Sequence, residues 1–96
     1  MRITAHCLVK NEENFVWFAL NSIISYVDEI MVWDQGSRDR TIQIIESIDS
    51  PKIKFKNAPG KVAEVRQEML KQTDADWIFI LDGDEIWSEE AMLALK

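Results

Sequence analysis

Two aspartates, Asp82 and Asp84, follow an apolar run near the end of this 96-residue sequence and are separated only by Gly83. Because they are two positions apart, both carboxylates can point to the same side of an extended chain. Two such charges about 4 Å apart repel by roughly 4 kcal/mol at an effective dielectric constant near 20. A divalent cation relieves this repulsion, and hard carboxylate oxygens suit Mg²⁺ or Mn²⁺. The alternative is an ordinary solvated turn with Gly83 as its turn residue.

The residues before these acids, Trp77 to Leu81, read W-I-F-I-L. An uninterrupted apolar run rich in aromatic and β-branched residues is typical of a strand that is buried on both faces of a parallel sheet. The two acids then lie at the carboxyl end of that strand. In open α/β sheets ligands bind at this edge, in the crevice lined by the loops that leave the strands. We therefore predict a ligand site at this edge, with Asp82 and Asp84 as metal ligands.

The composition excludes several classes of protein. With 47% hydrophobic and 29% charged residues, the chain is expected to fold as one globular domain over residues 1–96. The net charge of -6 argues against nucleic-acid binding, which needs a basic patch or stripe. No apolar run approaches the roughly 20 residues of a membrane span, and the N-terminus lacks a signal-peptide pattern, so the expected location is cytoplasmic. The single cysteine, Cys7, excludes an intrachain disulfide, and no Cys/His cluster indicates zinc.

Apolar segments alternate along the chain with amphipathic ones. Strands are predicted at residues 3–9, 29–34, 52–57 and from 77 into the acids, and helices at 14–26, 40–48, 61–72 and after Ser88. This alternation predicts a three-layer α/β/α fold with a mostly parallel sheet and right-handed crossovers. The expected strand order is 3-2-1-4, which places the loop at Lys10 beside Asp82 and Asp84.

Some polar side chains lie among apolar neighbours and need partners. Arg66 lies on the apolar side of the helix at 61–72, and an arginine that points toward a core requires an anion. Its expected partner is either an acid such as Asp34, in a structural ion pair, or a phosphate or nucleotide. His6 lies within an apolar strand and is expected to be a hydrogen-bonded core residue rather than a catalytic one. Asp39 or Ser37 is expected to cap the helix at 40–48.

Segments spread over nearly the whole chain together resemble family 2 glycosyltransferases. They are L-V-K-N-E-E at 8–13, V-D-E-I-M-V-W-D-Q-G-S-R-D-R-T at 27–41, V-R-Q-E-M-L at 65–70 and D-W-I-F-I-L-D-G-D-E at 76–85. D-x-G-S-x-D-x-T after a second strand, followed about 40 residues later by an apolar strand that ends in D-x-D-E, is far more specific than either piece alone.

The resemblance implies the Rossmann-like nucleotide-binding half of a glycosyltransferase A fold. It also implies a nucleotide-diphosphate sugar, with a uridine diphosphate sugar as first expectation, a divalent ion (Mn²⁺ or Mg²⁺) and glycosyl transfer to an acceptor. By position, the nucleotide would be wrapped by Val9, Lys10, Asn11 and Glu12. Asp34 would hydrogen-bond the base and Arg66 would lie near the nucleotide. Asp82 would lie by the ribose and the metal, Gly83 would contribute to binding of the nucleotide sugar, and Asp84 would bind the metal directly.

Members of the family normally continue past this motif with further strands, which form the acceptor site and carry the catalytic base. This sequence stops at Lys96. We therefore expect a donor-binding domain without its own catalytic base. It is either a fragment of a larger enzyme or a module whose exposed sheet edge is covered by a second copy, as a homo-oligomer.

Two other functions are left open by the sequence. One is a nucleotide- and metal-binding module without turnover, since catalysis by proximity needs an acceptor held in place. The other is a haloacid-dehalogenase-like phosphatase, in which Asp82 attacks phosphate and Asp84 acts as acid and base. That family carries its motif on the first strand, whereas here the motif comes last.

Overall fold

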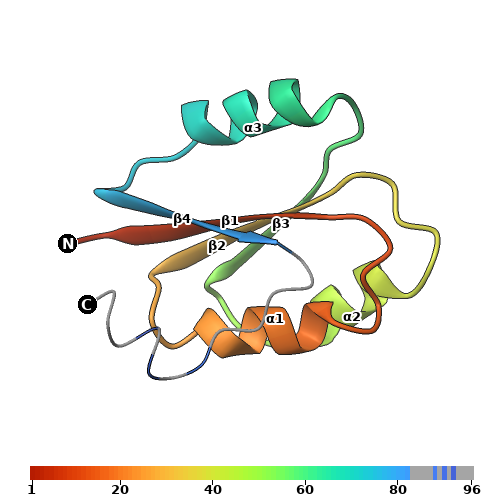
Figure 1. Ribbon diagram of the computed structural model, residues 1–96, viewed down its shortest axis with the longest axis horizontal. Helices are drawn as coiled ribbons and strands as arrows, with labels where there is room; N and C mark the ends of the chain where they lie inside the picture. The colour runs from red at the N-terminus through yellow and green to blue at the C-terminus, as the bar shows by residue number, and fades with distance from the viewer. Residues whose placement is uncertain (83–87, 89, 91, 93–96) are drawn as a thin grey trace.

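The computed structural model describes residues 1–82, 88, 90 and 92 (Figure 1). Its elements alternate as β1 (Ile3–Val9), α1 (Val16–Ile23), β2 (Glu29–Asp34), α2 (Thr41–Ser47), β3 (Ile53–Asn57), α3 (Val62–Lys71) and β4 (Trp77–Asp82). The strands lie where the sequence predicts them, and each helix is shorter than its prediction. The predicted helix after Ser88 falls mostly on residues outside those described. Among the described helices, none has the length and hydropathy to cross a membrane.

The described strands form one parallel sheet in the order β3-β2-β1-β4, which confirms the predicted topology. β1 pairs with β2 on one side and with β4 on the other, from Ile3↔Trp77 to Leu8↔Asp82. This central position explains why five of its seven residues are buried. The buried thiol of Cys7 lies among them.

The lower face of the sheet in Figure 1 is covered by α1 and α2, and the upper face by α3. α1 contacts the sheet through residues spaced i, i+3, i+4 and i+7, the stripe that a 3.6-residue period produces: Val16, Ala19, Leu20 and Ile23. α2 adds Ile45 to the same core. On the other face, Val65 and Met69 of α3 pack with Met31 and Trp33 of β2. Alternate residues of β2 therefore enter different cores.

The prediction that residues 77–81 are buried on both faces is wrong. Within the described residues, β4 pairs only with β1 and is an edge strand, in which Trp77 is 63% exposed and Ile80 58% exposed. Ile78 and Ile80 are on the side of α3, whose core is built on β1 and β2, so the outer part of that face is uncovered. Trp77 is on the opposite side, at the first position of the strand. Leu81 and Phe79 alone of this run pack into the core under α1 and α2.

His6 is a buried core histidine, as predicted. It is 4% exposed, and its Nε2 lies 2.6 Å from the hydroxyl of Thr73, which in turn donates to the carbonyl of Met69. Burial lowers the pKa of His6 below 6.5, and the nearby charge of Arg66 lowers it further. The folded protein therefore favours the neutral imidazole.

This lowered pKa predicts that the protein loses stability in mild acid. Below about pH 6.5 the unfolded chain binds a proton at His6 before the folded protein does, so the free energy of unfolding falls by up to about 1.4 kcal/mol per pH unit until the folded pKa is reached. Urea unfolding between about pH 5 and pH 8 measures this slope. His6→Asn removes the titrating group, so its slope is expected to be shallower. Equal slopes in the two proteins would contradict the assignment.

Candidate functional site

The carboxyl ends of β1, β2 and β4 meet at one edge of the sheet. In the register, Val9 pairs with Asp34 and Leu8 pairs with Asp82, so the two aspartates lie on either side of β1. Since neighbouring strands are about 4.8 Å apart, their Cα atoms are separated by roughly 10 Å. The segment from Lys10 leaves β1 between them. The predicted roles of Gly83 and Asp84 fall on residues outside those described.

The pleat of the sheet turns these two aspartates toward opposite faces. Asp34 follows the alternation of Ile30 and Val32, which enter the core under α1 and α2. Asp82 follows Leu81, which enters the same core, and therefore lies on the α3 side. One ligand at this edge could reach both acids, but through different parts of its structure.

Asp34 is 1% exposed, and three hydrogen bonds hold its carboxylate. Its Oδ2 accepts the backbone N–H groups of Gly36 and Ser37, both at 2.9 Å, and its Oδ1 accepts the hydroxyl of Ser37. Gly36 allows this tight turn because its φ of +97° is readily adopted only by glycine. A carboxylate has about four acceptor positions, so one position on Oδ1 is left for another donor.

The segment that follows β1 is the second part of this edge. Val9 is buried in the core, whereas Lys10 and Asn11 are exposed and Glu12 is partly exposed. Asn11 has a φ of +54°, in the left-handed region that asparagine tolerates better than most residues. Its backbone N–H donates to the hydroxyl of Ser37 at 2.9 Å. The loop after β1 is therefore joined to the loop after β2.

Arg66 is partly exposed on α3, on the opposite side of the sheet from Asp34. The structure shows no ion pair between these two residues, so Asp34 is not the acidic partner of Arg66, and the alternative of a phosphate or nucleotide partner stays a prediction. The alternation of the strands explains this, because Asp34 faces α1 and α2 rather than α3. Arg66 instead shares its face with His6, whose pKa it lowers, and with Asp82.

Asp82 supplies an exposed carboxylate at the end of β4. Among the residues that the structure describes, no group of three or more His, Cys, Asp or Glu side chains could hold a metal ion by itself. Mg²⁺ in proteins is often held by one or two carboxylates together with the phosphates of a substrate. The donor set at Asp82 fits that kind of site, in which ion and diphosphate bind together.

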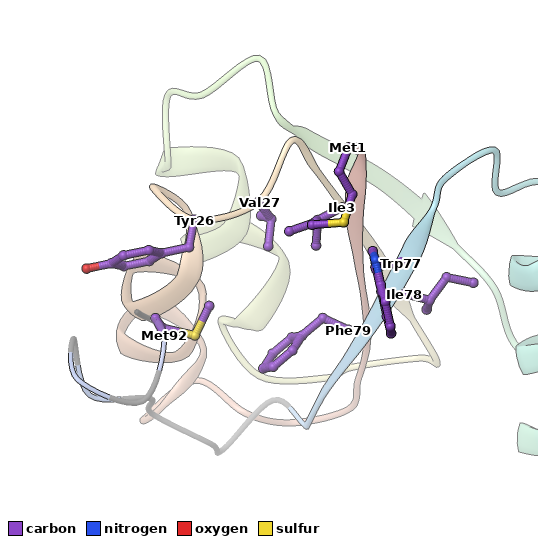
Figure 2. Close-up of a pocket in the computed structure, with 8 residues that line it drawn as sticks. All are labelled: Met1, Ile3, Tyr26, Val27, Trp77, Ile78, Phe79 and Met92. Carbon is purple, nitrogen blue, oxygen red and sulfur yellow. The ribbon is translucent and has the colours of Figure 1, made fainter. Parts of the chain in front are cut away.

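A largely apolar cavity of about 370 Å³ lies at the other end of the sheet (Figure 2). Its wall includes Met1, Tyr26, Trp77, Phe79 and Met92. In Figure 2 the ring of Phe79 points into the cavity, whereas Ile78 points away to the other side of β4. Because the wall offers few polar groups, this cavity does not suit a nucleoside diphosphate.

Two hydroxyl residues of this edge were missed as functional candidates by sequence reasoning. The sequence predicts only a helix-capping role for Ser37 and no role for Thr41. Asp39 does accept the backbone N–H of Thr41, the first residue of α2, as predicted. Ser37 and Thr41 instead bind both to acids of their own loop and to the loop after β1. The alternation of acids and hydroxyls in D-x-G-S-x-D-x-T was the available signal.

The sequence model of glycosyl transferase family 2 matches residues 7–95. The chain belongs to this family. The match spans both aspartates of the sheet edge and every loop described above, and it does not support the phosphatase interpretation.

Two relatives are similar over most of this chain. The glycosyltransferase SunS of Bacillus phage SPbeta is 31% identical over 90 residues, which are 92% of this chain and 21% of SunS. An uncharacterized glycosyltransferase of Rickettsia bellii is 35% identical over 91 residues, or 93% of this chain and 30% of the relative. The chain therefore spans about a fifth to a third of the length of these relatives.

Solved structures with the same fold include the crystal structure of residues 1–349 of S. aureus TarS. It superposes with a TM-score of 0.81 at 24% identity, and the match covers 99% of this chain and 31% of the crystallised TarS chain. Glucosyl-3-phosphoglycerate synthase from Mycobacterium tuberculosis, in complex with Mn²⁺ and UDP-glucose, gives a TM-score of 0.70 at 26% identity. That match covers 88% of this chain and 34% of the synthase. The predicted glycosyltransferase A fold is confirmed.

The bonds around Asp34 predict that its removal destabilises the protein. Asp34→Ala removes the buried carboxylate that accepts the N–H groups of Gly36 and Ser37, so we expect a loss of about 1–3 kcal/mol in the free energy of unfolding, measured in urea. Asp49→Ala, at an exposed loop position, is the control and is expected to stay within about 0.5 kcal/mol of the unchanged protein. Equal effects of the two substitutions would contradict a structural role for Asp34.

Proposed function

We propose that this edge of the sheet binds the nucleotide-diphosphate sugar of a glycosyl transfer reaction. The observation that carries the proposal is the placement of Asp34 and Asp82 on either side of β1, in a chain of glycosyl transferase family 2. The Lys10–Glu12 segment, in which Lys10 and Asn11 are exposed, lies between them. UDP-glucose and Mn²⁺ are bound by the synthase that shares the fold, which supports a uridine diphosphate sugar as donor.

The nucleobase is assigned to the α1 and α2 side of the edge. Three of about four acceptor positions of Asp34 are occupied, so the carboxylate can receive one further N–H donor through Oδ1. The imide N–H of uracil is a single donor of this kind. Val9, Lys10, Asn11 and Glu12 would line the nucleotide, with Val9 contributing only its main chain because its side chain is buried.

The diphosphate and its cation are assigned to the α3 side of the edge. Asp82 and Asp84 would hold Mn²⁺ or Mg²⁺ through carboxylate oxygens, with Gly83 close to the ribose and the metal. When bound, the cation stabilises the charge that develops on the departing nucleoside diphosphate. Arg66 makes no ion pair with Asp34. It lies on α3, which covers this side, so its positive charge would attract the diphosphate.

The acceptor and the catalytic base are not assigned to residues of this domain. We propose that residues 1–96 act as the donor-binding domain, and that the acceptor is bound by other parts of the protein. The relatives are three to five times longer than this domain, which supports this division. A nucleotide- and metal-binding module without turnover is the second candidate, and an assay for hydrolysis of the nucleotide sugar separates it from an enzyme.

The proposed site predicts that the cation strengthens nucleotide binding. Titration calorimetry is expected to show that Mn²⁺ increases the affinity for uridine diphosphate about tenfold or more, whereas Mn²⁺ alone binds weakly because the phosphates complete its coordination. Asp84→Ala is expected to remove the increase, and Asp82→Ala to reduce it. Asp49→Ala is the charge-matched control. Nucleotide binding that neither Mn²⁺ nor Asp84→Ala changes would rule out the metal role.

The outer edge of β4 is also proposed to associate with a second copy. Within the described residues its only strand partner is β1, and the exposed Ile80 and Trp77 lie on it. Exposed strand edges of this kind pair readily with other chains.

This association predicts an average mass that rises with protein concentration in light scattering. Ile80→Lys is expected to keep the protein monomeric, since a charge on an edge strand opposes pairing. Gln43→Lys adds the same charge to the exposed surface of α2 and is expected to have no effect. A constant monomer mass for the unchanged protein would refute the association.

A further inference from the structure

The loops after β1 and β2 are joined by four hydrogen bonds from main-chain N–H groups. Those of Asn11, Glu12 and Glu13 donate to side chains of Ser37, Thr41 and Asp39, at 2.9, 2.8 and 3.2 Å. In return, the N–H of Arg38 donates to the Asn11 side-chain oxygen at 2.8 Å. Three successive N–H groups of one loop are thus satisfied by polar side chains of the other.

Ser37 and Thr41 each use one hydroxyl group twice. The hydroxyl of Ser37 donates to Asp34 and accepts the N–H of Asn11. The hydroxyl of Thr41 donates to Asp39 and accepts the N–H of Glu12. Only a group that is both donor and acceptor can join a carboxylate to an N–H in this way, so neither alanine nor valine can replace it.

We propose that Ser37 and Thr41 are positioning residues that hold the Lys10–Glu13 segment ready for the nucleotide. We call this pair the hydroxyl clamp. Asp39 is then a structural acid that orients Thr41, although the sequence motif places it beside the ligand-binding residues. Desolvation raises the pKa of Asp39, but the hydrogen bonds from Thr41 and Glu13 together lower it by more, so the pKa lies below its usual value and the carboxylate stays ionised in this role.

The backbone of Asn11 gives the clamp a specific task. Its φ of +54° is unfavourable for a residue with a side chain, and both its N–H and its side-chain oxygen are held by the loop after β2. Without the clamp this segment would sample extended conformations as well. A nucleotide would then have to order the segment when it binds, which lowers affinity.

The effect of the clamp on donor affinity rests on the function proposed above, but the existence of the clamp does not. The clamp can be detected in the protein without ligand, by hydrogen exchange of single backbone N–H groups in NMR spectra. Ser37→Ala is expected to speed exchange at Asn11, and Thr41→Val at Glu12, by about tenfold or more. Thr41→Val keeps the volume of a buried side chain, so it tests the hydroxyl rather than the packing.

The same variants are then titrated with uridine diphosphate and Mn²⁺. We expect each to bind about tenfold more weakly than the unchanged protein, with Thr41→Ser restoring affinity because it keeps the hydroxyl. Ser47→Ala is the control, since that serine donates within α2, to the carbonyl of Ile44, and it should change neither measurement.

The outcomes separate the two proposals. Unchanged exchange at Asn11 and Glu12 in the variants would refute the clamp. Faster exchange with unchanged affinity would refute its positioning role and leave a purely structural one. If the unchanged protein does not bind the nucleotide at all, the proposed function fails together with the positioning role, while the exchange rates still decide whether the clamp exists.

Discussion

The parallel pairing of β1 with both of its neighbours is the constraint on which the rest of this structure depends. Because β2 and β4 run in the same direction as β1, the residues that end all three strands come to one edge. β1 lies in the middle of the sheet, where helices cover both faces, so it is almost wholly buried and its alternating residues face the two cores under α1 and under α3. The core and the candidate site are thus two results of one arrangement.

Much of this arrangement could be predicted from the sequence. Apolar segments of six or seven residues that alternate with segments of helical periodicity indicate a parallel sheet. The spacing of the apolar residues in α1 predicts which side of that helix is buried. Burial of β4 could not be predicted in the same way. An apolar run has the same composition in a central strand and in an edge strand, and only the position of α3 determines that Ile78 and Ile80 are exposed.

The site was predictable to a different extent. The strand order sufficed to bring Asp34 and Asp82 to one edge, because topology alone fixes that proximity. Whether Arg66 can pair with Asp34 depends on the face of the sheet to which the Asp34 side chain points. Side chains alternate along β2, so this face is known only once the register of the strand is known. The roles of Ser37 and Thr41 required coordinates, since they arise from contacts between loops 26 to 29 residues apart.

The opposite facing of Asp34 and Asp82 limits how such a domain can vary. Insertion of one residue within β4 would exchange the faces of the side chains that follow it, turning Asp82 toward α1 and α2 and bringing Leu81 into its place. The connection between α3 and β4 lies before the strand, where a change of length leaves that alternation intact. Variation in length is therefore expected at the end of the sheet opposite the candidate site, while the strands themselves keep a fixed count.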